Sequence, residues 1–165
     1  MIKFGTFVKL CKTRKENKIK NELLEAKNLS AYAHYRQKDK AGVDYFKGHI
    51  TAVVEGLDSS SENITKEKTV AYLHDIVEDT FISIDSIRKM FSPDIAEAVE
   101  ILTKDPKMDY MKYIKRIKEN PLARAVKISD LKNNSDLSRL KEITEKDLKR
   151  TEKYKKALSF LLEEE

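Results

Sequence analysis

The sequence has little cysteine, proline, glycine or tryptophan. Its 165 residues include one cysteine, Cys11, three prolines, four glycines and no tryptophan. One cysteine excludes a disulfide within the chain and is typical of a reducing compartment, so we expect a cytoplasmic protein. Few prolines and glycines favour long helices joined by short connections. The scarcity of these residues therefore predicts a helical protein without a disulfide framework.

A long hydrophobic run is also missing. No apolar stretch approaches the roughly 20 residues that a membrane-spanning helix needs, so we expect no membrane partner. Residues 1–20 contain a short apolar patch, but neither an extended apolar core nor a small-residue cleavage site. We therefore interpret this segment as part of the mature protein and not as a signal peptide.

The charge is basic by a small margin. The chain has 33 Lys and Arg residues against 28 Asp and Glu, a net charge of +5. The two signs are interleaved, except in the run KLCKTRKENKIK at residues 9–20. A net positive charge of this size suits a pocket for a small anionic molecule as well as it suits nucleic acid. Nucleic-acid binding through residues 9–20 is therefore the less favoured interpretation.

Helical periodicity and capping signals follow one another along the chain. Residues 1–16 show no clear period, and we expect a short strand or an irregular arm there. Helices are expected over 18–37, 45–57, 63–80, 83–91, 92–104, 108–120, 120–133 and 144–162. Predicted N-cap residues are Thr65, Ser83, Ser92, Asn120 and Thr144, the last in a capping box with Asp147. The pattern predicts an all-α fold, a helical bundle that forms a single domain over residues 1–165.

The stretch AYLHDIVEDT at 71–80 places four functional groups within six residues. On one continuous helix with His74 at 0°, Glu78 falls at about 40°, and Asp75 and Asp79 follow at about 100° and 140°. Such an arc is typical of a solvated helix face. Asp75 nevertheless repels Glu78 and Asp79, and the stretch contains no Lys or Arg. A cation would relieve this repulsion, and imidazole nitrogen with carboxylate oxygen favours Mn²⁺, Fe²⁺ or Zn²⁺ over Ca²⁺.

Further metal ligands must come from elsewhere in the chain, where histidine occurs only at His34, His49 and His74. His49 faces an apolar stripe of the helix expected at 45–57, where a lone histidine is either a satisfied core residue or a ligand. Asp130 ends the apolar run ARAVKISD, and a buried carboxylate needs a partner. We expect His34 to be structural or to line a pocket. A catalytic site with two nitrogens, two oxygens and room for water would consist of His49, His74, Asp75 and Asp130.

From about Ala31 to Leu140, the sequence resembles the HD-domain metal-dependent phosphohydrolases. LHDIVEDT, with YRQKDKAG upstream and VKISDLKNNSD downstream, is similar to the RelA/SpoT-type (p)ppGpp hydrolase domains, including their small single-domain forms. LTK at 102–104 and the region of Tyr110 also match this branch. The resemblance implies an HD-domain helical bundle. Residues 141–165 would form a C-terminal helix that packs on the domain or makes a homodimer contact.

The resemblance also implies roles for individual residues. One Mn²⁺, or another divalent transition metal, would be held by His49, His74, Asp75 and Asp130. Glu78 and Asp79 would position or activate a water molecule that attacks phosphorus, which would release pyrophosphate from the ribose 3′ position. The substrate-binding residues would be Lys40 and Asn134, and Asn134 would touch the nucleotide or order the site.

The chain departs from the family pattern at three places. The family motif Gly-x-Pro-Tyr-x-x-His reads GVDYFKGH here, without the proline and one residue longer from Gly42 to His49. We expect a loop to absorb the additional residue. Asp39 stands where the family has an Arg that stacks on guanine, and Leu131 and Asn133 replace an Arg and a His. These departures predict intact core chemistry with an altered substrate pocket.

Three functional hypotheses follow from the sequence. The first is a phosphohydrolase whose leading substrate is (p)ppGpp, with other phosphorylated nucleotides, such as NADPH, as alternatives. The second is a non-catalytic nucleotide sensor with the same fold, against which the presence of both Glu78 and Asp79 argues. The third is a helical module that binds nucleic acid, whose affinity would depend steeply on salt.

Overall fold

The computed structural model describes residues 4–140 and 142–163, and its regular structure in these ranges is helical. No strand forms there, and the one isolated backbone bridge pairs Lys38 with Asp44. The α-helices are α1 (Phe4–Ala33), α2 (Thr51–Glu55), α3 (Ile64–Leu73), α4 (Ile76–Asp79), α5 (Ile84–Met90), α6 (Pro93–Leu102), α7 (Tyr110–Lys118), α8 (Pro121–Ser135) and α9 (Glu145–Leu162). A π-helical turn, η1 (Phe46–Ile50), and a 3₁₀ turn, η2 (Leu137–Arg139), lie between them. The predicted all-α fold is confirmed.

Three helices begin with the side-chain caps that the sequence predicts. Ser83 accepts a hydrogen bond from a backbone N–H at the start of α5, and Asn120 does the same at the start of α8. Thr144 and Asp147 form a capping box at the start of α9. Each cap satisfies backbone donors that the first turn of a helix leaves without partners.

The starts of α3 and α6 differ from the prediction. Helix α3 begins after Asn63, so Thr65 lies inside its first turn and is not the N-cap residue. Ser92 is the N-cap residue of α6, but its side chain makes no capping bond to that helix. Its hydroxyl and its backbone N–H donate instead to the carboxylate of Glu22, at 3.1 and 2.8 Å. The start of α6 is therefore attached to α1.

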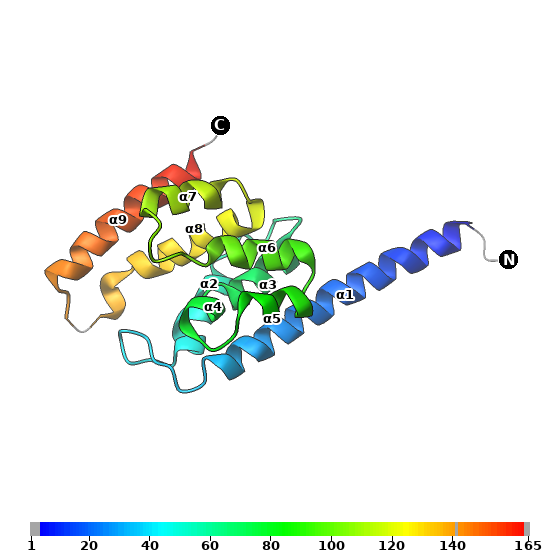
Figure 1. Ribbon diagram of the computed structural model, residues 1–165, viewed down its shortest axis with the longest axis horizontal. Coiled ribbons are helices and arrows are strands. Elements are labelled where there is room, and N and C mark those ends of the chain that lie inside the picture. The colour runs from blue at the N-terminus through cyan, green and yellow to red at the C-terminus, as the bar shows by residue number, and fades with distance from the viewer. Residues whose placement is uncertain (1–3, 141, 164–165) are drawn as a thin grey trace.

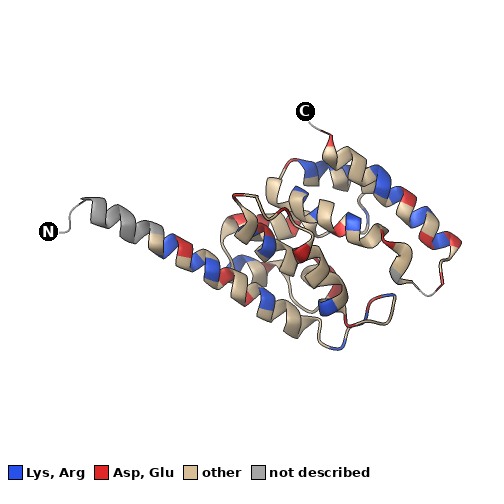
Figure 2. Cartoon of the chain, turned by 180° about the vertical axis from the view of Figure 1, so that it is seen from behind, with Lys and Arg blue, Asp and Glu red and all other residues tan. Residues whose placement is uncertain are grey.

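Helix α1 is longer than expected at its N-terminal end. It begins at Phe4, so the strand or irregular arm predicted for residues 1–16 is wrong for residues 4–16, and residues 1–3 lie outside the described ranges. No proline or glycine interrupts the chain between Gly5 and Ala33, and its Lys, Glu and Leu residues favour a helix. Figure 1 shows the N-terminal half of α1 extending away from the other helices. Figure 2 shows Lys, Arg, Asp and Glu interleaved along its described part and along α9.

Helices α3 and α8 form the centre of the bundle (Figure 1). Helix α8 packs against α2, α3, α6, α7 and α9, and α3 also packs against α1, α2 and α6. Their buried residues include Val70, Ala71, Leu73, Ala123, Val126 and Leu131. Full burial of an aliphatic side chain of this kind contributes about 1.5–3 kcal/mol. Side chains at the ends and on the inner faces of these helices therefore have well-defined positions. Among the described residues, no helix is both long enough and apolar enough to span a membrane.

Candidate functional site

An interruption of the helix directs the side chains of two neighbouring residues toward one point. The continuous helix expected over 71–80 is wrong, because α3 ends at Leu73 and α4 begins at Ile76. Asp75 leaves the regular helical path, with φ −103° and ψ −1°. His74 Nε2 and Asp75 Oδ2 consequently lie 3.0 Å apart, although adjacent residues on a helix diverge by about 100°. The two side chains can therefore bind the same ion.

His49 lies in the π-helical turn η1. The interval from Gly42 to His49, in which we expect a loop to absorb the additional residue, spans the end of a loop and this turn. Thr51 N–H and its hydroxyl both bond to Phe46 O, five residues earlier, the hydroxyl at 2.8 Å. A π-turn is the usual result of one inserted residue in a helix and often occurs at functional sites. It keeps His49 on the buried side, 4% exposed.

Close packing between α2 and α8 brings Asp130 to the two histidines. Ser129 Oγ donates to Val53 O at 2.7 Å. A Cβ atom at Gly56 would lie 2.5 Å from that same Oγ, so only glycine permits this approach of the two segments. Asp130, the next residue on α8, is 3% exposed and has its Oδ1 3.4 Å from His49 Nε2.

The four predicted ligand residues lie together at the centre of the protein. One ligand atom each from His49, His74 and Asp130 lies within 4.8 Å of the others. The two Nε2 atoms are 3.3 Å apart, and Asp75 Oδ2 is 3.3 and 3.0 Å from them. Ligands bound at about 2.0–2.2 Å to a single transition metal lie about 3.0–3.5 Å apart. The donor set fits one divalent transition metal, and the distances match this spacing except that from His74 Nε2 to Asp130 Oδ1, which is 3.8 Å.

Hydrogen bonds behind the histidines hold both Nε2 atoms toward this centre. His49 Nδ1 lies 2.9 Å from Asn133 Oδ1, and His74 Nδ1 lies 2.8 Å from Ala71 O. Both acceptors fix the proton on Nδ1, which leaves Nε2 as the ligand atom of a neutral imidazole. Asn133, which replaces a histidine of the family pattern, thus supports His49. The sequence did not indicate this role.

Three other side chains contact the carboxylates. Tyr45 donates its hydroxyl to Asp75 Oδ2 at 2.6 Å. Lys127 Nζ and Asn134 Nδ2 donate to the two oxygens of Asp130, at 2.8 and 2.6 Å. Tyr45 and Lys127 were not predicted, although VKISD places Lys127 one helical turn before Asp130, a spacing at which side chains meet.

The pKa shifts of the two histidines and of Asp130 show that the carboxylates at this centre interact strongly with nearby positive charge. Burial lowers the pKa of His49, but its hydrogen bonds to Asp130 and Asp75 outweigh burial and raise the pKa to about 10. The pKa of His74 is raised for the same reason, mainly by the charge of Asp75. Burial opposes ionisation of Asp130, but Lys127 and His49 hold its pKa well below the usual value. A divalent cation would supply the same charge in place of protons.

Glu78 and Asp79, the predicted water-activating pair, face different surroundings. Glu78 accepts a hydrogen bond from the backbone N–H of Lys104 and lines the same cavity as His74 and Asp75. Asp79 lies near Gln37, whose Nε2 is 3.5 Å from its Oδ2. Burial, followed by other charges that include Asp75, raises the pKa of both carboxyl groups. Of the two carboxylates, that of Glu78 faces the cavity beside the candidate metal centre.

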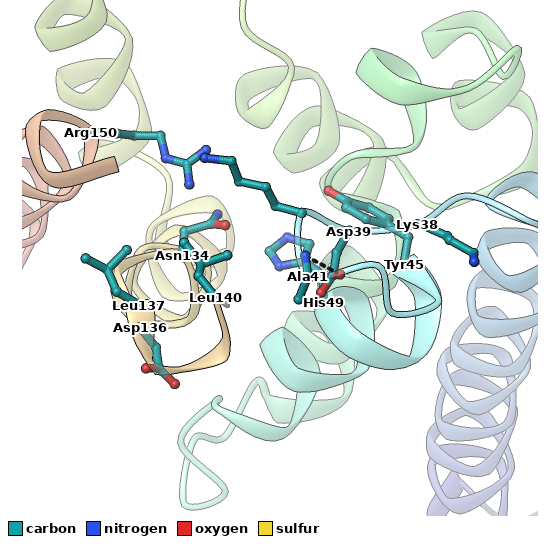
Figure 3. Close-up of a pocket in the computed structure, with 11 residues that line it drawn as sticks. Lys38, Asp39, Ala41, Tyr45, His49, Asn134, Asp136, Leu137, Leu140 and Arg150 are labelled. Carbon is teal, nitrogen blue, oxygen red and sulfur yellow. Dashed lines mark hydrogen bonds between the residues drawn. The ribbon is translucent and has the colours of Figure 1, made fainter. Parts of the chain in front are cut away.

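Two cavities of about 240 Å³ each adjoin the centre. The first, here named the loop cavity, lies between the loop 38–45, the end of α8, η2 and α9 (Figure 3). It is lined by both predicted substrate-binding residues, Lys40 and Asn134, together with His49 and Arg150. Asp39 folds back within the loop, where its Oδ1 accepts from the N–H groups of Ala41 and Val43, both at 2.9 Å.

The second, here named the lysine cavity, lies on the other side of Asn134. Besides Glu78 and three of the ligand residues, His74, Asp75 and Asp130, it is lined by Lys104, Tyr110, Tyr113, Lys127, Lys153 and Tyr154. Lys153 Nζ lies 3.7 Å from the centroid of the Tyr110 ring. A polyanion that reaches the centre would meet cationic side chains in both cavities. Lys153 and Arg150 lie beyond Leu140, outside the span on which the sequence resemblance rests.

Comparison with known proteins identifies the fold. No family model matches the chain. A solved structure of a metazoan ortholog of SpoT, described as hydrolysing ppGpp and playing a role in starvation responses, superposes with a TM-score of 0.70. The match covers 86% of this chain and 85% of that chain, at 23% sequence identity. The chain therefore has the helical fold of that ppGpp hydrolase, as the motif resemblance predicted, and a buried His/Asp cluster that fits a metal.

Proposed function

We propose that this protein is a metal-dependent phosphohydrolase that acts on a phosphorylated nucleotide. The observation that carries the proposal is the convergence of His49, His74, Asp75 and Asp130 on one buried point that opens into two cation-lined cavities. A purely structural metal site would be closed by its ligands, whereas this one adjoins space for a substrate.

A divalent transition metal, with Mn²⁺ as the proposed ion, would supply Lewis acidity and lower the pKa of a nearby water molecule. His49 and His74 provide Nε2 atoms whose direction is fixed by Asn133 and Ala71. Asp75 and Asp130 provide the negative charge that favours a cation at this place. Asn134 and Lys127 hold the Asp130 carboxylate in one orientation.

Glu78 is the proposed proton acceptor. Its carboxylate lines the cavity that contains His74 and Asp75, and its raised pKa makes it a stronger base than an ordinary glutamate. In the proposed step, water oxygen bonds to phosphorus and Glu78 takes a proton from the water. The bond from phosphorus to the ribose oxygen breaks, and that oxygen keeps the electron pair and takes up a proton from solvent. Asp79, paired with Gln37, is proposed to hold the loop that precedes η1 against α4.

The proposed substrate is (p)ppGpp, from which the reaction releases pyrophosphate at the ribose 3′ position. The motif resemblance and the fold shared with a ppGpp hydrolase support this choice. Because Asp39 folds into its own loop, its carboxylate does not replace the arginine that stacks on guanine in the family. Other 3′-phosphorylated nucleotides, and NADPH with its 2′-phosphate, are therefore included as alternative substrates.

A release assay tests the proposal. Purified full-length protein is offered ppGpp, pppGpp, NADPH and a nucleotide panel with Mn²⁺, with Zn²⁺ and with a chelator. We expect Mn²⁺-dependent release of pyrophosphate or phosphate that Asp75→Asn and Glu78→Gln each reduce at least 100-fold. Glu97→Gln, an exposed carboxylate on α6, is the matched control and should retain wild-type rates.

Two outcomes would contradict the proposed function. Release that survives both site substitutions would place the chemistry elsewhere. Tight binding of a nucleotide without turnover, in protein that contains metal, would favour the non-catalytic sensor.

A further inference from the structure

His34 is buried directly after the end of α1, behind the candidate metal centre. It is 1% exposed, and its ring packs on that of Tyr45 with the two ring centroids 5.2 Å apart. Tyr45 packs in turn on His49, and His49 packs on His74, at centroid distances of 5.1 and 5.3 Å. Four rings therefore form a continuous row from the end of α1 to two of the predicted metal ligands.

Tyr45 is the ring of this row whose hydroxyl contacts a carboxylate. It donates to Asp75 Oδ2 at 2.6 Å. The direction of a tyrosine hydroxyl follows from the side-chain torsions that place its ring, and the packing of neighbouring groups selects these torsions. His34 and His49 both pack on the ring of Tyr45. The ring of His34 therefore helps to direct the hydroxyl toward Asp75.

The second contact of His34 is to a glutamine. Its Nδ1 lies 2.7 Å from Gln37 Oε1, and Gln37 Nε2 donates to Asp79 Oδ2 at 3.5 Å. An ionised carboxylate only accepts hydrogen bonds, so the amide turns its NH₂ toward Asp79 and its oxygen toward His34. This orientation requires a proton on Nδ1 of His34.

The other nitrogen of the same ring agrees with this tautomer. His34 Nε2 is buried, and the described part of the chain provides it with no hydrogen-bond partner. A buried acceptor without a partner is tolerated more often than a buried N–H without one. An unprotonated Nε2 is therefore the less costly state, and it leaves the proton on Nδ1, where Gln37 accepts it.

The backbone turn between His34 and Gln37 contains a strained residue. Arg36 has φ 65°, in the left-handed region that residues other than glycine rarely occupy. Gln37 N–H donates to His34 O at 3.0 Å, and Tyr45 N–H donates to Gln37 O at 2.9 Å. Such strain persists only where surrounding contacts determine the conformation, and it is concentrated at functional sites. The turn brings the side chain of Gln37 between His34 and Asp79.

We propose that His34 is a positioning residue with two separate effects on the site. Its ring holds Tyr45 against Asp75, which favours binding of the metal. Its Nδ1–H orients Gln37 toward Asp79, which attaches the loop 38–45 beside the substrate. This inference rests on the proposed function, because it assigns a residue that supports the same site.

The tautomer of His34 is tested first, in the metal-free wild-type protein. Long-range ¹H–¹⁵N NMR spectra at neutral pH distinguish a ring that is protonated on Nδ1 from one that is protonated on Nε2. We expect His34 to carry its proton on Nδ1. A proton on Nε2 would leave Gln37 without its donor and would overturn the proposal.

Two substitutions of His34 separate the ring from the donor. His34→Asn keeps an N–H donor near the place of Nδ1 but loses the ring, so Mn²⁺ affinity should fall about three- to tenfold, within reach of the effect of an outer contact. KM for ppGpp should change less than twofold. His34→Phe keeps the ring but loses the donor, so KM should rise about three- to tenfold, the usual effect of one lost hydrogen bond. Its Mn²⁺ affinity and its kcat should stay within twofold of the wild-type values.

Double-mutant cycles show whether each effect passes through the proposed neighbour. In a Tyr45→Phe background, His34→Asn should not lower Mn²⁺ affinity further, because no hydroxyl remains to be directed. In a Gln37→Leu background, His34→Phe should not raise KM further. Ser30→Ala is the matched control. Ser30 is fully buried one turn earlier on α1, and its Oγ has no hydrogen-bond partner within the described ranges.

A general loss of structure gives a different result. It would change Mn²⁺ affinity and KM together in both variants of His34, or give additive effects in either cycle, and each of these results rejects the positioning role. Thermal unfolding checks that every variant folds. Where one variant of His34 is unfolded, the tautomer and the other variant decide.

Failure of the proposed function is recognised separately. If the wild type binds Mn²⁺ and hydrolyses no nucleotide, the proposed function fails, and the affinities with their cycle decide the role of His34. If it binds no divalent ion, the hydroxyl proton of Tyr45 is followed by NMR. A signal that is kept in His34→Phe and shifted or lost in His34→Asn supports the role, and an unchanged signal in both variants rejects it.

Discussion

His49 and His74 face one another with their Nε2 atoms 3.3 Å apart, although 25 residues separate them in the chain. Each ring turns its Nδ1 to an oxygen acceptor behind it, and among the described residues neither Nε2 has a neutral donor to pair with. Two imidazoles in this arrangement, beside two carboxylates, require positive charge between them. The relationship explains why the carboxylates of the 71–80 stretch are tolerated without a lysine or arginine in that stretch.

Metal binding should stabilise the fold measurably. An ion that binds only the folded state adds about 2.7 kcal/mol to the free energy of unfolding at a concentration 100 times its Kd. We expect Mn²⁺ added to chelator-treated protein to raise Tm, and Asp75→Asn to abolish most of that rise. Differential scanning calorimetry with and without the ion measures both. An equal rise of Tm in the variant would place the ion outside this site.

Tyr45 should tune the affinity for the ion through Asp75. Tyr45→Phe removes the hydroxyl that donates to Asp75 Oδ2 at 2.6 Å. Loss of such an outer contact lowers metal affinity about 10- to 100-fold. Tyr72→Phe is the control, because Tyr72 stacks on Phe46 on the neighbouring helical segments. Competition with a fluorescent chelator gives both affinities, and identical values for the two variants would refute the role of Tyr45.

The contact between Gly56 and Ser129 should govern the stability of the fold. Gly56→Ala places a Cβ 2.5 Å from Ser129 Oγ, and overpacking of this kind costs about 1–3 kcal/mol. Adding Ser129→Ala removes the clashing oxygen, so the double variant should recover part of the stability lost in the single one. Urea unfolding of the four proteins of this cycle gives the coupling energy. Strictly additive effects would show that the two segments do not pack as described.

Asp147 should make the fold sensitive to acid. Hydrogen bonds from Lys40 and then from Thr144 hold its pKa well below the usual value for a carboxyl group. A carboxylate with a depressed folded-state pKa stabilises the fold above its unfolded pKa of about 3.9 and loses that contribution as the pH falls further. The difference in Tm between wild type and Asp147→Asn should therefore be constant from about pH 5 to 7 and shrink below about pH 4. A difference that stays constant down to pH 2 would contradict this ionisation.

Much of the fold could be predicted from the sequence because its signals are local. Ser83, Asn120 and Thr144 start helices through bonds to their own next turn, so the pattern of neighbouring residues is sufficient. The extended α1 was missed because the apolar residues of its first turns, Phe4, Phe7, Val8 and Cys11, cover only two helical turns and a run of charged residues follows them.

The candidate site was predictable in its ligand types and not in its geometry. His49, His74, Asp75 and Asp130 stand out because scarce histidines and core carboxylates need partners. The break between α3 and α4 and the π-turn at His49 leave no local signal, since both depend on packing against other helices. Asn133, Lys127 and Arg150 belong to the site only through contacts that folding creates, so their sequence positions alone did not indicate their roles.

The most direct test of the central claim follows the oxygen of the attacking water. Hydrolysis of ppGpp with Mn²⁺ in ¹⁸O-labelled water is analysed by mass spectrometry of the products. Attack on phosphorus at the 3′ position predicts one ¹⁸O atom in the released pyrophosphate, none in guanosine 5′-diphosphate, and a reaction at least 100-fold slower in Glu78→Gln. Label in the nucleoside product, or labelled pyrophosphate formed at an undiminished rate by Glu78→Gln, would contradict the account.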